Sequence, residues 1–213
     1  MPRRMPLFAT TLDQRVQEAL KLAEAGELAL VTSPRPSLLR SAWNAHRVEL
    51  LYELAYLRMF IEWEAFLERT FVRYLCGYTS RHGVASPIGG RFKNNLATAE
   101  AAVLGGRPFA LWHRPSDVIA RAQAFFIHSL HETVVASNEP RLVDLAAVRH
   151  RIAHGQEDAK RKFDRATMNF TGRRYSGARP GRFLRDWNHS ISPTNRWLQS
   201  LGGEMVNLAK QIA

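Results

Sequence analysis

The sequence predicts an all-α protein, an up-and-down helical bundle with additional short helices. Three observations lead to this prediction. Apolar residues recur at spacings of three and four through most of the chain, which is the period of an amphipathic helix. No segment alternates convincingly between apolar and polar residues, as a half-buried strand would. Because 46% of the 213 residues are apolar, the chain can build one sizeable core, and we expect a single domain over residues 1–213.

Residues 1–36 are predicted to form a helix and a turn. The helix begins at Thr11 and ends at Gly26, because glycine commonly follows the last helical residue. Residues 28–31 are apolar but too few to assign, and the proline-rich residues 33–36 predict a turn. The apolar face of this helix consists of Leu12, Val16, Ala19, Leu20 and Ala23.

A long helical segment is predicted from near Ser37 to about Leu75, since it contains neither proline nor glycine. One straight helix of that length would span about 58 Å, so a bend or break is plausible. Its apolar stripe predicts a central bundle helix whose aromatic residues pack in the core and do not form a base-stacking surface. The stripe contains Leu51, Ala55, Met59, Phe60, Trp63, Phe66, Leu67, Phe71 and Tyr74.

The middle of the chain alternates loops and shorter helices. We expect a loop over residues 77–90, a helix over 92–104, and a bent helix from Pro115 to Val135. The next helix is expected to follow an N-cap at Asn138. It carries Leu142, Leu145, Val148 and Ile152 on one face, and Gly155 stands where a left-handed glycine would end it.

Three further segments complete the prediction. Residues 157–169 are expected to form a basic helix, and residues 171–191, rich in arginine and glycine, a basic loop. Residues 192–213 should form a C-terminal helix that begins at Ser192-Pro193 and is weakened by Gly202-Gly203.

The charge of the chain is strongly positive and unevenly distributed. Thirty Lys and Arg against nineteen Asp and Glu leave +11. Between residues 149 and 185 there are eleven Lys/Arg and three Asp/Glu, so +8 lies in 37 residues. Such a concentration favours a polyanionic partner, the alternative being an ordinary solvated basic face.

Composition excludes several classes of protein. One cysteine, Cys76, excludes an internal disulfide and a cysteine-rich metal site. No run of about 18 apolar residues predicts a membrane span. Residues 1–7 lack the apolar stretch of a secretory signal, so we expect a cytoplasmic protein.

The candidate chemistry lies in the stretch Arg149-His150-Arg151-Ile152-Ala153-His154-Gly155, at the end of a predicted helix. A guanidinium can hold a phosphate with several N–H donors, and an imidazole can transfer protons near neutral pH. These two groups are the minimum that cleavage of RNA without a metal requires. Arg149 and His154, five residues apart, lie about 140° apart on one helix, whereas His150 and His154 share a face.

This stretch resembles the HEPN superfamily of small helical ribonucleases and nucleotide-binding domains. The family pattern is an arginine, a polar residue, three others and a histidine, matched here by Arg149, His150 and His154. Residues 152–153 and 155 also match its common form, and residues 63–68 look like the partner helix of many such proteins.

The resemblance implies a metal-independent endoribonuclease that acts as a homodimer and needs no cofactor. The ribose 2′-OH would attack the adjacent phosphorus and leave a 2′,3′-cyclic phosphate and a 5′-OH. His154 would then handle the proton, Arg149 would stabilise the transition-state charge, and His150 would orient the phosphate. A toxin–antitoxin, defence or stress setting with an antitoxin or regulatory partner is also implied. Some family toxins carry a tyrosine for adenylation where this chain has Gln156, so that form of silencing is not expected.

The basic residues beyond the motif predict an RNA-contacting surface. Phosphate contacts set affinity and register and carry little sequence information. The candidate RNA-binding residues are Arg151, Lys160, Arg161, Lys162, Arg165, Arg173 and Arg174. Arg179, Arg182 and Arg185 extend this surface, and Tyr175 and Phe183 could stack a base, although packing is favoured for both.

Other interpretations remain open at the level of sequence. His154 could cap helix carbonyls while Arg149 pairs with Glu64 or Glu68. The chain could be a non-catalytic RNA- or nucleotide-binding HEPN module, or a helical scaffold without a nucleic-acid partner. A zinc site at His150 and His154 is disfavoured, because zinc needs three or four ligands and the flanking arginines repel a cation.

Overall fold

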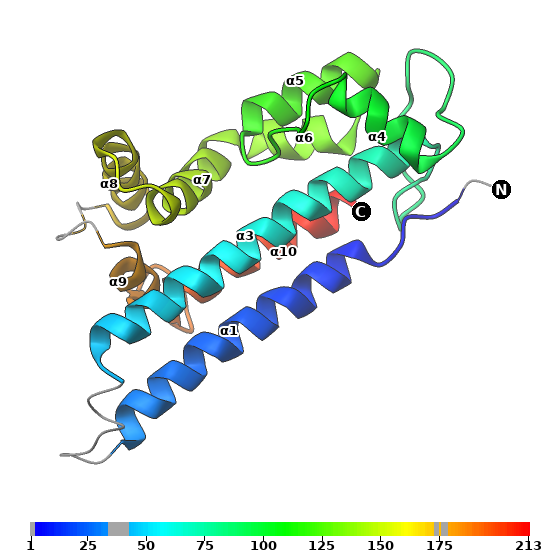
Figure 1. The fold of residues 1–213 in the computed structure, drawn as a ribbon. Coiled ribbons are helices and arrows are strands. Elements are labelled where there is room, and N and C mark those ends of the chain that lie inside the picture. Colours follow the sequence, from blue (N-terminus) through cyan, green and yellow to red (C-terminus); the bar gives the residue numbers. More distant parts are fainter. Residues whose placement is uncertain (1–2, 34–42, 173–174, 176–178) are drawn as a thin grey trace. The chain divides into compact units, whose positions relative to one another are not determined.

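The computed structural model describes residues 3–33, 43–172, 175 and 179–213, and it confirms the all-α prediction (Figure 1). The helices are α1 (Phe8–Thr32), α3 (Ala45–Leu75), α4 (Leu96–Leu104), α5 (Pro115–Phe125), α6 (Leu130–Ser137), α7 (Glu139–Ala153), α8 (Glu157–Thr171), α9 (Pro180–Arg185) and α10 (Trp197–Ile212). Strands β1 (Trp187–Asn188) and β2 (Asn195–Arg196) pair antiparallel, with Trp187 opposite Arg196. Within the described ranges, no helix combines the length and the apolarity that crossing a bilayer requires.

The chain forms two compact units. Unit 1 consists of Met1–Leu12, Glu62–Val143 and Met205–Ala213. Unit 2 consists of Asp13–Ile61 and Asp144–Glu204. Helices α1, α3, α7 and α10 contribute residues to both. The expectation of a single domain over residues 1–213 stays a prediction.

The core of unit 1 is built around Phe71 of α3. Its ring makes edge-to-face contacts with Trp112, Phe126 and His131, at centroid distances of 5.4, 5.0 and 5.2 Å. Such aromatic pairs contribute about 0.5–1.5 kcal/mol each beyond the area that they bury. His131 is a fully buried polar residue in this aromatic cluster.

The core of unit 2 is built around Phe183 of α9. Its ring stacks on Phe170 of α8 and on Trp197 of α10, at centroid distances of 5.6 and 5.3 Å. The hydroxyl of Tyr56 in α3 donates a 2.8 Å hydrogen bond to the carbonyl of Leu145 in α7. This bond fixes α7 against α3 where both helices belong to unit 2, and thereby sets the position of the α7 C-terminus.

The aromatic stripe of α3 packs in the core as predicted. Phe60, Trp63, Phe66, Phe71 and Tyr74 are all at most 3% exposed. The helix begins at Ala45, where Asn44 Oδ1 accepts a 3.0 Å hydrogen bond from the backbone N–H of Arg47. The predicted start near Ser37 lies outside the described residues.

Of two predicted glycine helix ends, the one at Gly26 is wrong, and the one before Gly155 is right in position but lacks the expected left-handed glycine. Helix α1 runs through Gly26 to Thr32, so it includes residues 28–31. A side chain at Gly26 would collide with Leu51 of α3, so this glycine permits a close approach of the two helices. Helix α7 ends at Ala153, but Gly155 is not among the glycines with left-handed backbone angles.

Several other boundaries also differ from the prediction. The segment expected as one bent helix forms α5 and α6, because the Ser129 side chain accepts a hydrogen bond from the N–H of Glu132 and starts a new helix. The expected loop over residues 171–191 contains α9 and β1, and the C-terminal helix begins at Trp197, after β2. Asn138 does precede α7, but its side-chain amide donates to the carbonyl of Val134.

Candidate functional site

The end of α7 brings two of the three predicted catalytic side chains together. His150 and His154 share a helical face as their spacing predicts, and their ring centroids lie 4.6 Å apart. The backbone N–H of His154 donates to the carbonyl of His150 at 2.9 Å, so the last helical hydrogen bond aligns the two residues. His154 is exposed, whereas His150 and Arg149 are half-buried.

The surroundings of His150 favour its neutral form. Partial burial lowers its pKa, and the charges of His154 and Lys162 lower it further. Asp158 opposes this shift, and Arg149 adds to it. At neutral pH His150 is therefore an uncharged imidazole, which can accept a proton or a hydrogen bond.

The guanidinium of Arg151 is partly shielded from solvent. Its Nε and Nη1 atoms are buried and have no hydrogen-bond partner among the described residues. Its charge acts on Glu53, which also accepts a 2.8 Å hydrogen bond from the backbone N–H of Gly181. Burial is the largest influence on Glu53 and raises its pKa. Of the predicted RNA-binding residues, Arg151 is thus poorly presented to a ligand.

The solvent face of α8 carries four of the predicted RNA-binding residues. Its opposite face is buried through Ala159, Phe163, Ala166, Thr167 and Phe170. On the solvent face, Lys162 pairs with Asp158 at 2.7 Å, Arg161 with Asp158 at 3.5 Å, and Lys160 with Glu157 at 3.4 Å. Arg165 is exposed on the same helix. Exposed pairs of this kind contribute at most about 1 kcal/mol each, so a phosphate can replace them.

Two other cations of the predicted RNA-contacting surface form ion pairs within the protein. Arg179 pairs with Glu49 at 3.3 Å. Arg185 donates two hydrogen bonds, of 2.6 and 3.0 Å, to the carboxylate of Glu27 in α1. Arg173 and Arg174 lie outside the described residues.

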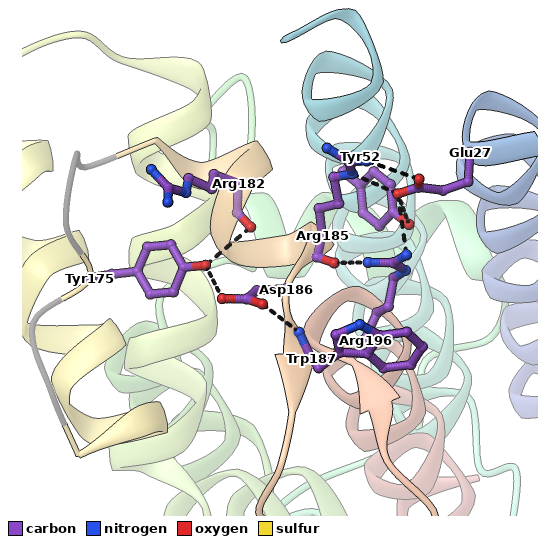
Figure 2. A network of polar contacts seen from close by, with 8 residues as sticks. All are labelled: Glu27, Tyr52, Tyr175, Arg182, Arg185, Asp186, Trp187 and Arg196. Atoms are coloured by element: carbon purple, nitrogen blue, oxygen red, sulfur yellow. Dashed lines mark hydrogen bonds and ion pairs between the residues drawn. The ribbon is translucent and has the colours of Figure 1, made fainter. Parts of the chain in front are cut away.

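Glu27 is the centre of the polar network drawn in Figure 2. Besides Arg185, it pairs with Arg196 at 3.5 Å and accepts a 3.1 Å hydrogen bond from Tyr52. Burial alone would raise the pKa of Glu27, but the hydrogen bond and charge of Arg185, with the charge of Arg196, outweigh it and lower the pKa. The network ties α9 and β2 to α1 and α3 within unit 2.

A polar cavity of about 270 Å³ adjoins this network. It is lined by Glu49, Tyr175, Arg182, Arg185, Asp186, Trp187 and Arg196. Trp187 and Arg196 were not singled out from the sequence. Only the position of a tryptophan within a polar segment, between Asp186 and Asn188, indicated a surface role. Of the aromatic residues considered for stacking, Phe183 is fully buried.

The described residues contain no candidate metal centre, and the comparisons with known proteins found no relative. Across the described residues, no three metal-ligating side chains form a cluster. Comparison of the chain with protein-family models, curated proteins and solved structures found no match.

Proposed function

We propose that the protein is a metal-independent endoribonuclease with Arg149, His150 and His154 at its catalytic site. The observation that carries this proposal is the pair of imidazoles 4.6 Å apart at the end of α7. One ring is exposed and the other is held neutral next to Arg149 and the basic face of α8. This combination supplies proton transfer and phosphate binding in one place.

The reaction that fits these groups is a transesterification. The 2′-oxygen forms a bond to phosphorus while the bond from phosphorus to the 5′-oxygen breaks. The His154 imidazole of one protomer takes the 2′-OH proton as general base, and the His154 imidazole of the other gives a proton to the leaving 5′-oxygen as general acid. The products are a 2′,3′-cyclic phosphate and a 5′-hydroxyl. We assign proton transfer to His154, phosphate orientation to His150, and stabilisation of the pentacoordinate phosphorus to Arg149.

Dimerisation follows from the helical geometry in this proposal. Arg149 and His154 lie about 140° apart around an ideal helix, so one α7 presents them in different directions. Two copies of α7 related by a twofold axis would let the arginine of one protomer approach the histidine of its partner. The catalytic unit is therefore a homodimer with a shared cleft.

The α8 cations form the RNA-binding surface in this proposal. Lys160, Arg161 and Lys162 would replace their exposed ion pairs with RNA phosphates, releasing counterions, and the exposed Arg165 would add a further phosphate contact. A cytoplasmic toxin, defence or stress effector with an antitoxin or regulatory protein is the setting that we propose for such an enzyme.

The test is cleavage of single-stranded RNA in the presence of EDTA. We expect wild-type protein to produce 2′,3′-cyclic phosphate ends, and His154→Ala and Arg149→Ala each to reduce the rate by about 10²-fold or more. The matched control is His128→Ala, which removes an exposed imidazole in unit 1. Cleavage that survives both substitutions would refute the catalytic assignment. RNA binding without cleavage by wild-type protein would favour the non-catalytic RNA-binding module.

A further inference from the structure

Trp187 is an exposed tryptophan whose indole ring lies against the guanidinium of Arg196. Its side chain belongs to the two-residue strand β1, and the residue is 47% exposed. The guanidinium carbon of Arg196, its cross-strand partner, lies 4.6 Å from the centroid of the indole ring. A cation over one face of an aromatic ring polarises and holds it, and the exposed area leaves room for a second planar group.

Two polar contacts hold the guanidinium of Arg196 in place. One of its nitrogens donates to the carbonyl of Arg185, and another pairs with Glu27 at 3.5 Å. In Figure 2, dashed lines from Tyr52, Arg185 and Arg196 meet at Glu27, and a separate line joins Arg196 to the carbonyl of Arg185. Because the guanidinium is already held, little side-chain entropy remains to be lost when a ligand stacks on Trp187.

The backbone that carries the indole is also fixed. The N–H of Trp187 donates to Asp186 Oδ1 at 2.9 Å, and the hydroxyl of Tyr175 donates to Asp186 Oδ2 at 2.5 Å. Both oxygens of Asp186 are therefore engaged, which reduces its repulsion of an anionic ligand. Trp187 and Asp186 both line the polar cavity next to the stack.

Arg182 provides a positive charge on the same cavity. Its side chain is exposed, and its guanidinium has no hydrogen-bond or ion-pair partner within the part of the chain that the structure describes. Its carbonyl lies 3.3 Å from the Tyr175 hydroxyl, whose proton is directed at Asp186. An unengaged guanidinium and a stacking face that line one cavity match the two parts of a nucleotide, the phosphate and the base.

We infer that Trp187 is a stacking platform for an unpaired base of RNA, and that Arg182 binds a phosphate of the same strand. The inference rests on the proposed RNA substrate and adds a binding site in unit 2 that lies outside the catalytic motif. Stacking on an aromatic side chain tolerates any base, so the platform selects single-stranded over duplex RNA and reads little sequence.

The first experiment measures binding of a labelled single-stranded RNA by fluorescence anisotropy, in a His154→Ala background that prevents cleavage. Trp187→Ala should raise Kd about 10-fold, whereas Trp187→Phe should retain most of the affinity because it keeps an aromatic face. Arg182→Gln should reduce the salt dependence by about one phosphate contact. The control is Ile191→Ala, which removes an exposed apolar side chain near β1.

A second experiment reports on the indole directly. In NMR spectra, the indole N–H resonance of Trp187 is identified as the one that Trp187→Phe lacks, and titration of AMP should shift it. In the anisotropy assay, Trp187→Ala should not affect binding of blunt duplex RNA. Equal affinity of Trp187→Ala and Ile191→Ala for single-stranded RNA would overturn the inference and leave the indole as a protein contact. Loss of RNA binding by every variant, wild type included, would overturn it as well. Binding that depends on Trp187 in a protein that never cleaves RNA would support the platform and refute the nuclease.

Discussion

Lowering the pH from 7.5 to 5 should destabilise the protein through His131. This residue is fully buried in unit 1, between the rings of Phe71 and Tyr74. The Thr70 hydroxyl donates to the carbonyl of Phe66, so His131 Nε2–H donates to Thr70 Oγ1 at 2.9 Å. His131 Nδ1 is buried without a partner among the described residues, so a proton placed there would have no acceptor. Burial accordingly lowers the pKa of His131 to about 3.

The size of the effect follows from proton linkage. The unfolded chain binds a proton at His131 near pH 6.5, whereas the folded chain stays neutral until about pH 3. Between these values the unfolded state holds more protons, so the free energy of unfolding falls as the pH falls. The stability is complete above pH 6.5, and about 2 kcal/mol of it is lost at pH 5, since each pH unit below 6.5 corresponds to about 1.4 kcal/mol.

Urea denaturation at several pH values measures this slope. His131→Gln keeps a donor for Thr70 but does not titrate, so its stability should depend less on pH, by about 1.3 kcal/mol per unit near pH 5. Exposed His189→Gln is the matched control. The ring protons of His131 should also fail to titrate between pH 7.5 and 5 in NMR spectra. Parallel curves for wild type and His131→Gln would refute the reasoning.

Three further substitutions test the packing and charge of unit 2 by the same denaturation assay. Glu27→Gln should cost about 1–3 kcal/mol at pH 7, because it leaves Arg185 half-buried without its anion. Since the pKa of Glu27 is lowered, this difference should disappear as the pH falls below the folded pKa. Gly181→Ala should cost about 1–3 kcal/mol, because a Cβ there overlaps the backbone of Glu49. Gly203→Ala, in open space within α10, should instead stabilise by about 0.5–1 kcal/mol.

The long helices could be predicted from sequence because their signal is local and repeated. The apolar stripe of α3 extends over many turns, and α8 buries one face while its charges lie on the other. Helix α9 was missed because six residues carry too short a pattern. It exists because Phe183 fills the core of unit 2 and Gly181 fits against Glu49, contacts that join distant parts of the chain.

At the candidate site too, contacts between residues close in sequence could be predicted, and contacts between distant residues could not. The adjacency of His150 and His154 was predictable, since four residues make one helical turn. The pairing of Arg185 with Glu27 was not, because 158 residues separate them in sequence. The helix end predicted at Gly26 was wrong for a related reason. Gly26 reads locally as a helix end, but it is required by the close approach of Leu51 from another helix.

The net charge of +8 over residues 149–185 overstates the positive charge that is available to bind a polyanion. Arg179 and Arg185 neutralise Glu49 and Glu27, which lie in helices outside that segment. The Glu27 pair is half-buried and holds α9 in place, so a phosphate that displaced Glu27 would leave an anion in the interior without its cation. The α8 pairs are exposed and separate at little cost. Within the described part of residues 149–185, and outside the α7 motif, the cations able to exchange partners are therefore those on α8, together with Arg182 on the polar cavity. An RNA strand bound by these groups would be held by phosphate contacts along α8 and by a stacked base on the β1–β2 hairpin. Under that arrangement, binding depends on where the charges are placed, more than on how many the segment contains.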